Sequence, residues 1–192
     1  MNYKNLIIGL FICNSTFVIA AEKVTPKLSC LITPNSIANV KIGMKAMGVK
    51  KIIPTATFKK FTDGEGVSGV AVMMNGKELL YFYTGEEEDT PIDFTRKIGS
   101  LMTGNASFNC KTKDGIGPGT LLNAAAKKLG GIEKIQLTEI ESREYVFFKL
   151  QPKHSFFRSG QNDYSNTGLY KPESRVTKKY LPNSIITAIE IY

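Results

Sequence analysis

His154 is the only histidine of the chain, and Ser155 and Ser159 stand close to it in the sequence. An imidazole that takes the proton of a serine hydroxyl activates a nucleophile, so a hydrolase is one function class that the sequence allows. Neighbours in sequence rarely form such a pair, and the chain has no G-x-S-x-G turn. One histidine also excludes a metal site built from several histidines. We therefore interpret His154 as a surface or strand-end residue.

The only acidic run is Glu86, Glu87, Glu88 and Asp89. Paired carboxylates hydrolyse glycosidic bonds or hold calcium in other proteins. Adjacent carboxylates on one loop repel each other, and the sequence shows no second pair that would face them across a cleft. We interpret the run as a solvated connector between two parts of the chain, and we expect neither a bound metal nor a cofactor.

A glycine-rich stretch, GIGPGT at residues 115–120, precedes a predicted helix. Free backbone amides at such a turn can bind an anion. The stretch lacks the lysine and the spacing of a phosphate-binding loop, and it is not a G-x-G-x-x-G motif. A plain turn in which Thr120 caps the helix is the favoured interpretation.

The final third of the chain is rich in aromatic residues, most of which we expect in the core. Tyr164 and Tyr170 are the exception, because they lie in a long polar loop at residues 161–182, and long loops are often functional. Tyrosine and arginine supply much of the energy of protein interfaces. The binding site predicted from the sequence consists of Arg158, Ser159, Gly160, Tyr164, Tyr170 and Lys171.

The first 20 residues have the order of a secretory signal peptide. Lys4 precedes an apolar stretch at residues 6–13, and Ala20 lies near its end. The stretch is far shorter than the ~20 apolar residues that a membrane-spanning helix needs. We expect cleavage after Ala20 or one residue later, which leaves residues 21–192 as a single periplasmic or secreted domain.

Of the three cysteines, Cys13 lies within the expected signal peptide, where bulky Ile12 argues against a lipid-modified cysteine. Cys30 and Cys110 remain in the mature chain. The compartments to which proteins are exported oxidise thiols, so the sequence predicts a disulfide between these two residues.

The chain has 25 Lys and Arg against 17 Asp and Glu, a formal net charge of +8. This excess favours anionic partners, such as lipid head groups, cell-wall polymers or acidic proteins. The lysines are spread along the chain without a run of five or six, and export also argues against a nucleic-acid partner.

Residue patterns predict two short helices and several strands. The helices are expected at residues 45–52 and from Thr120 to a stop at Gly130. Strands are expected at residues 56–61, 67–75, 78–84, 134–140, 144–150 and 184–192.

Two details of these strands are specific. Asn75 and Gly76 predict a tight hairpin turn between antiparallel strands, because both residues accept positive φ angles. In the last strand, alternation places the side chains of one face on a single side, and these are Ile185, Thr187, Ile189 and Ile191.

The predicted fold class is α+β, an antiparallel sheet with one or two short helices packed on it. The two halves of the chain resemble each other in the order of a cysteine, a helix, a K-K or E-K pair and strands. A second form of the prediction is therefore two similar tandem units, residues 28–88 and 96–192, with Cys30 and Cys110 at corresponding places.

The segments IGMKAM, DGIGPGTLLNAAAKKLGG and NSIITAIEIY resemble, in order, a family of uncharacterised Gram-negative envelope proteins that includes a sigma-E-regulated lipoprotein. This resemblance implies an envelope location and an architecture, and no activity.

Ser159, Gly160 and Tyr164 form SGxxxY, which is similar to the SGxxY motif of periplasmic lysozyme inhibitors but one residue longer. The favoured function is a non-enzymatic periplasmic or secreted module that binds an envelope component or protein. The alternatives are a lysozyme-inhibitor-like protein and a periplasmic hydrolase.

Overall fold

The computed structural model describes residues 30–62, 66–86, 90–139, 142–161 and 165–192. These residues form mostly antiparallel sheet with two short α-helices, so the α+β fold class is confirmed. No helix among them is long and apolar enough to cross a membrane. The expected signal peptide lies outside the described residues, as do residues 87–89 of the acidic run.

The larger sheet contains nine strands of the described chain, in the order β12-β9-β10-β11-β13-β7-β6-β5-β4. In chain order they are β4 (Thr57–Thr62), β5 (Ser68–Met74), β6 (Lys77–Glu86), β7 (Ser100–Thr103), β9 (Ile132–Leu137), β10 (Glu144–Phe148), β11 (Ser155–Gly160), β12 (Val176–Thr177) and β13 (Ile185–Ile191). Every neighbouring pair is antiparallel. The predicted turn between β5 and β6 is confirmed, with φ of 52° at Asn75 and 71° at Gly76.

A small second sheet has the order β3-β2-β1-β8. Its strands are β1 (Leu31–Thr33), β2 (Ser36–Ile37), β3 (Val40–Lys41) and β8 (Lys111–Thr112). β1 and β8 run parallel, and Leu31 pairs with Lys111. The disulfide between Cys30 and Cys110 lies directly before these two strands and is confirmed. It joins the places at which the two halves of the described chain begin.

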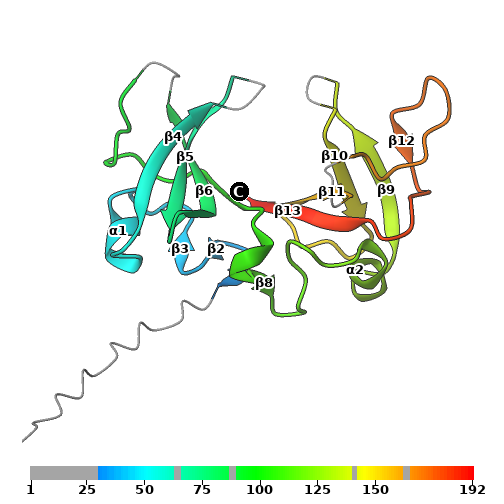
Figure 1. Ribbon diagram of the computed structural model, residues 1–192, viewed down its shortest axis with the longest axis horizontal. Helices are drawn as coiled ribbons and strands as arrows, with labels where there is room; N and C mark the ends of the chain where they lie inside the picture. The colour runs from blue at the N-terminus through cyan, green and yellow to red at the C-terminus, as the bar shows by residue number, and fades with distance from the viewer. Residues whose placement is uncertain (1–29, 63–65, 87–89, 140–141, 162–164) are drawn as a thin grey trace, which may run out of the picture.

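The order of elements repeats in the two halves. Helix α1 (Gly48–Ile52) precedes β4, β5, β6 and β7, and helix α2 (Leu122–Lys128) precedes β9, β10, β11 and β13. In the sheet, β7 and β13 pair at the centre. Outward from them, β6, β5 and β4 follow on one side and β11, β10 and β9 on the other, both in reverse chain order, and β12 lies at the edge beyond β9. Figure 1 shows this approximate two-fold arrangement, with α1, β4, β5 and β6 at the left and α2, β9, β10 and β11 at the right.

Backbone hydrogen bonds repeat with the same spacing in the two halves. In the first half, Gly43 N donates to Ile98 O, Ile98 N to Met44 O, and Ala46 N to Arg96 O. In the second half, the equivalent bonds run from Gly119 N to Ile186 O, from Ile186 N to Thr120 O, and from Leu122 N to Ser184 O. All six distances lie between 2.7 and 2.9 Å. This equivalence groups β7 with the first half, whereas the second half-unit was expected to begin at residue 96. The common origin of the halves stays a prediction.

The main core lies between one face of the large sheet and a layer made by the helices and the small sheet. Val49 of α1 and Leu122 of α2 are fully buried there, together with Phe82 and Phe157 of the large sheet. Because side chains alternate across a strand, the neighbours of these strand residues point to the opposite face. That second face carries the candidate site described below.

Both helices differ from their predicted starts. Helix α1 begins at Gly48 rather than at residue 45. The N-cap of α2 is Leu121 rather than Thr120, and no side chain caps this end. The hydroxyl of Thr120 instead accepts a hydrogen bond from the backbone of Gly117. The Thr120 side chain therefore stabilises the turn before the helix instead of capping the helix.

A β-bulge changes the predicted face of β13. Arg158 pairs with Ala188 while the next residue of β11 pairs with Ile186, so Thr187 is the extra residue. An extra residue reverses the alternation along a strand. Ile186 is therefore buried with Ile189 and Ile191, whereas Ile185 and Thr187, which were expected on the same face, are partly exposed.

Candidate binding site

The face of the large sheet opposite the helices, called the open face below, carries a continuous row of side chains. Strand register aligns, from β4 to β11, Lys59, Ala71, Tyr81, Met102, Glu190 and Phe156. The aromatic residues of this face gather in one group on each half.

The first aromatic cluster consists of Phe61, Tyr81 and Tyr83. The ring centroids of Phe61 and Tyr81 are 4.9 Å apart, and those of Phe61 and Tyr83 are 5.7 Å apart. These rings meet across β5, where Gly69 has no side chain. A Cβ atom on Gly69 would lie 2.8 Å from the Phe61 ring, so the glycine leaves the space that the cluster fills.

The second aromatic cluster consists of Tyr145, Phe147, Phe156 and Tyr192. Phe156 is its centre, with ring centroids 5.7 Å from Tyr145, 6.4 Å from Phe147 and 5.0 Å from Tyr192. The ammonium group of Lys134 lies 4.5 Å from the centroid of Phe147. All these aromatic side chains except Tyr192 are only partly exposed, and Tyr192 is exposed.

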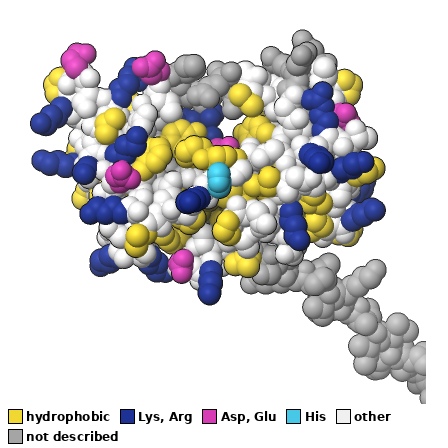
Figure 2. Space-filling model, turned by 180° about the vertical axis from the view of Figure 1, so that it is seen from behind, with side chains coloured by type: hydrophobic (Ala, Val, Ile, Leu, Met, Phe, Trp, Pro, Cys, Tyr) yellow, Lys and Arg dark blue, Asp and Glu magenta, His cyan; other side chains and the backbone are white. Residues whose placement is uncertain are grey.

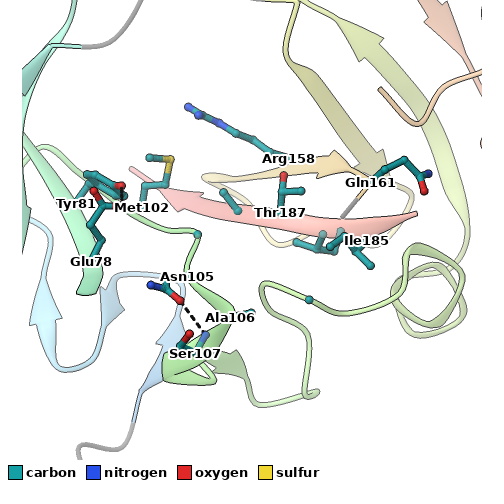
Figure 3. A pocket seen from close by; sticks show the side chains of 14 residues that line it. Glu78, Tyr81, Met102, Asn105, Ala106, Ser107, Arg158, Gln161, Ile185 and Thr187 are labelled. Carbon is teal, nitrogen blue, oxygen red and sulfur yellow. Dashed lines mark hydrogen bonds between the residues drawn. The ribbon is translucent and has the colours of Figure 1, made fainter. Parts of the chain in front are cut away.

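Two adjoining pockets lie between the clusters, beside β13. The larger has a volume of about 610 Å³ and is lined from both halves, with Tyr81 and Met102 on one side and Arg158 on the other. The smaller has a volume of about 240 Å³ and includes Ser159 and Gly160. Arg158 and Thr187 line both pockets. Figure 3 shows the Arg158 side chain pointing from β11 toward the side on which Tyr81 and Met102 lie.

Arg158 occupies a restricted environment. Its side chain is 17% exposed, and Nη2 lies 3.7 Å from a carboxylate oxygen of Glu190. The guanidinium carbon lies 5.5 Å from the ring centroid of Tyr145. Nε is buried and has no hydrogen-bond partner among the described residues. One N–H donor of this group therefore has no acceptor within the described protein.

The structure brings together three of the residues predicted for binding, because Arg158, Ser159 and Gly160 line the smaller pocket. Tyr164 lies outside the described residues. Lys171 is exposed and does not line either pocket.

Tyr170 differs from the exposed contact residue that the sequence predicts. It is partly buried, and its hydroxyl donates a 2.7 Å hydrogen bond to Glu144, a carboxylate that is 2% exposed. The same carboxylate accepts hydrogen bonds from the backbone and hydroxyl of Thr167, at 2.5 and 2.6 Å, and from the backbone of Gly168, at 2.7 Å. Tyr170 and Glu144 thus hold the chain after β11 against the sheet.

Tyr170 is expected to resist ionisation in alkaline solution. Burial, together with the hydrogen bond and the negative charge of Glu144, raises the pKa of Tyr170 well above its ordinary value of 10.0. A raised folded-state pKa contributes stability below the unfolded value, and this contribution is lost as the pH rises from there toward the folded value. Ultraviolet titration of phenolate should therefore show Tyr170 ionising only as the protein unfolds, and Tyr170→Phe should flatten the loss of stability above pH 10. A native-state phenolate signal from Tyr170 near pH 10 would contradict this.

The hydrolase alternative gains no support from the surroundings of His154. Its ring contacts Tyr192, with centroids 5.3 Å apart. The hydroxyl of Ser155 donates to the carbonyl of Pro152, and that of Ser159 pairs with Thr167. Neither serine is paired with the imidazole. Among the described residues no group of three or more His, Cys, Asp or Glu side chains could hold a metal ion.

The glycine-rich turn uses its own amides. Gly115 donates to the carbonyl of Thr112, and Gly117 donates to the hydroxyl of Thr120. The nearby Lys111 donates to Thr120 and to the carbonyl of Pro118, and burial lowers its pKa. These contacts favour the plain turn over an anion site.

Sequence reasoning missed the open face. Phe147, Phe148, Phe156 and Phe157 were all expected among mostly core aromatics, yet only Phe148 and Phe157 are buried. The alternation of side chains along β10 and β11 would have indicated that one phenylalanine of each adjacent pair faces away from the core. Comparisons with protein families, curated proteins and solved structures find no match to the chain.

Proposed function

We propose that this protein is a non-enzymatic binding module that works outside the cytoplasm and takes its partner on the open face of the large sheet. The observation that carries the proposal is the pair of aromatic clusters on that face, one from each half, with the two pockets between them. The rings of both clusters are partly exposed, and Tyr192 is exposed, so they are available to a partner.

The residue types on this face favour a protein partner. Tyrosine and arginine are enriched among residues whose loss weakens interfaces most, and aromatic residues anchor best when neighbours exclude water around them. Phe61 is held by Tyr81 and Tyr83, and Phe156 by Tyr145, so these rings are already ordered before a partner arrives. Ordered side chains lose less conformational entropy on binding.

Charge favours an acidic partner. The formal net charge is +8, which attracts negative surfaces and speeds the encounter with them. Figure 2 shows a face on which hydrophobic side chains gather near the middle and Lys and Arg side chains are spread around them. A second copy of the chain would carry the same excess of positive charge and would be repelled.

An extracytoplasmic location is supported by two features. The Cys30–Cys110 disulfide is typical of an oxidising compartment. The first residues have the order of a signal peptide. The resemblance to Gram-negative envelope proteins also supports a periplasmic location. The geometry does not favour the lysozyme-inhibitor alternative, because Ser159 and Gly160 lie within β11 rather than on a protruding loop.

Substitution of one aromatic residue in each cluster tests the proposal. We expect Tyr81→Ala and Tyr145→Ala each to reduce the capture of a partner from envelope extract by about tenfold or more, because loss of an interface anchor costs ~2 kcal/mol or more. Capture is measured with immobilised mature protein, and bound proteins are quantified by mass spectrometry against wild type.

Leu150→Ser is the matched control. Leu150 is 69% exposed and lies beside Gly130, at the end of α2, outside both clusters. Its substitution should leave capture unchanged, and thermal melts should show that all three variants remain folded. Equal capture by wild type and both tyrosine variants would contradict the proposal, as would a loss of capture only in Leu150→Ser.

A further inference from the structure

We infer that Arg158, where the two pockets meet, receives a carboxylate group of the partner. This inference rests on the proposed function and adds the chemistry of its anchor. A guanidinium group has five N–H donors in a planar fork. The ion pair with Glu190, at 3.7 Å from Nη2, is longer than a hydrogen bond. Nε, in contrast, is buried without an acceptor among the described residues.

A buried donor without an acceptor is unusual, because native proteins satisfy most buried polar groups with protein, water or ligand. A carboxylate matches this donor well. Its two oxygens accept parallel hydrogen bonds from Nε and one terminal nitrogen of the same guanidinium group. Thr187 also lines both pockets, and Figure 3 shows its hydroxyl oxygen on the side of Arg158.

The surrounding charges favour one negative charge over two. Arg143 and Arg158 both line the smaller pocket. Glu190 offsets part of the charge of Arg158. Glu144 also lines this pocket, and its carboxylate offsets positive charge as well, although its oxygens accept four hydrogen bonds from Thr167, Gly168 and Tyr170. A carboxylate, with a single charge, suits this balance better than a phosphate group.

The geometry therefore points to an acidic side chain of a protein partner as the occupant. The aromatic clusters lie on either side of the pockets and would contact the surface around that side chain. The Arg158–Tyr145 contact, at 5.5 Å, holds the guanidinium group against the second cluster. Arginine rather than lysine is required, because only a planar fork offers two parallel donors to one carboxylate.

The Nε–H signal of Arg158 in a nitrogen–proton correlation spectrum reports this contact directly. The titrated sample is the mature protein with its disulfide intact, and the probes are sodium acetate and two blocked pentapeptides with a central Glu or Gln. We expect acetate and the Glu peptide to shift the Arg158 Nε–H signal at constant ionic strength, and the Gln peptide to leave it in place. Arg175, whose guanidinium group donates to the carbonyl of Thr138 outside both pockets, is the reference signal.

Two further probes, inorganic phosphate and vesicles that contain phosphatidylglycerol, distinguish a phosphate ligand from a carboxylate. A shift with phosphate or vesicles, but none with acetate or the Glu peptide, would overturn the inference in favour of a phosphate ligand. The absence of a shift with every probe would also overturn it.

Partner capture provides the second test. Arg158→Lys and Arg158→Met should each reduce capture by about tenfold or more, the effect of losing a charge-assisted hydrogen bond, while Arg175→Lys should not. Arg158→Lys keeps the positive charge. A loss of capture in this variant would therefore show that the planar guanidinium group, and not positive charge alone, is needed, and thermal melts check the fold of each variant.

If the tyrosine variants lose capture but both Arg158 variants retain it, this inference fails and the proposed function stands. If the Nε–H signal shifts as expected but the tyrosine variants capture normally, the proposed function fails while the carboxylate site remains.

Discussion

Replacing Cys30 and Cys110 together with alanine should lower the free energy of unfolding by about 4.5 kcal/mol, the chain-entropy value for a closed loop of this length. The disulfide spans 80 positions of the sequence and ties together the parallel strands β1 and β8, where the two halves begin. Without it, the unfolded chain gains many conformations. Urea unfolding monitored by circular dichroism measures the change, and a steeper dependence on urea should accompany it because the unfolded state exposes more surface.

Reduction of the wild-type protein provides the matched experiment. It should produce nearly the same loss of stability as the double substitution, and the Cys30→Ala, Cys110→Ala variant should not respond to the reductant at all. An unfolding midpoint that is unchanged by reduction would show that packing around the buried Cys110, rather than the covalent bond, holds the halves together.

Replacing Glu144 with leucine should lower the free energy of unfolding by about 3 kcal/mol or more, since it leaves several buried donors without an acceptor. Glu144 is 2% exposed and accepts four hydrogen bonds, two of them from the fully buried Thr167. The leucine side chain has a similar volume, so the effect reports the lost acceptor rather than a cavity. Urea unfolding measures it, and hydrogen exchange at the Thr167 and Gly168 amides should become faster.

Two further variants should change the free energy of unfolding by smaller amounts. Tyr170→Phe removes one of the four donors and should cost about 1 kcal/mol. Glu133→Gln alters an exposed carboxylate on the neighbouring β9 and should change stability by less than about 0.5 kcal/mol. If Glu144→Leu is as stable as Glu133→Gln, the chain after β11 does not depend on this carboxylate.

The role of Tyr170 shows which kind of contact could not be predicted from the sequence. Its aromatic type and its position in a long polar segment correctly indicate a residue with a specific contact. The contact, however, is with Glu144, 26 positions earlier in the chain, and its ring packs over Gly168, where a side chain would clash. Nothing in the local pattern shows that a distant glutamate would be buried on the core side of β10.

Local residue types determined most of the strands, the Asn75–Gly76 turn and the fold class, because backbone preferences and alternation act over a few residues. The pairing of Cys30 with Cys110 was also predicted from the sequence, because the third cysteine, Cys13, lies within the expected signal peptide. The tertiary structure alone decided that β7 and β13 meet at the centre of one sheet, which gives the two halves a common open face. It also decided the β-bulge at Thr187, which buries Ile186 and leaves Thr187 beside Arg158 in both pockets. These features depend on pairing between strands far apart in sequence, and that pairing is set by packing of the whole core rather than by any short segment.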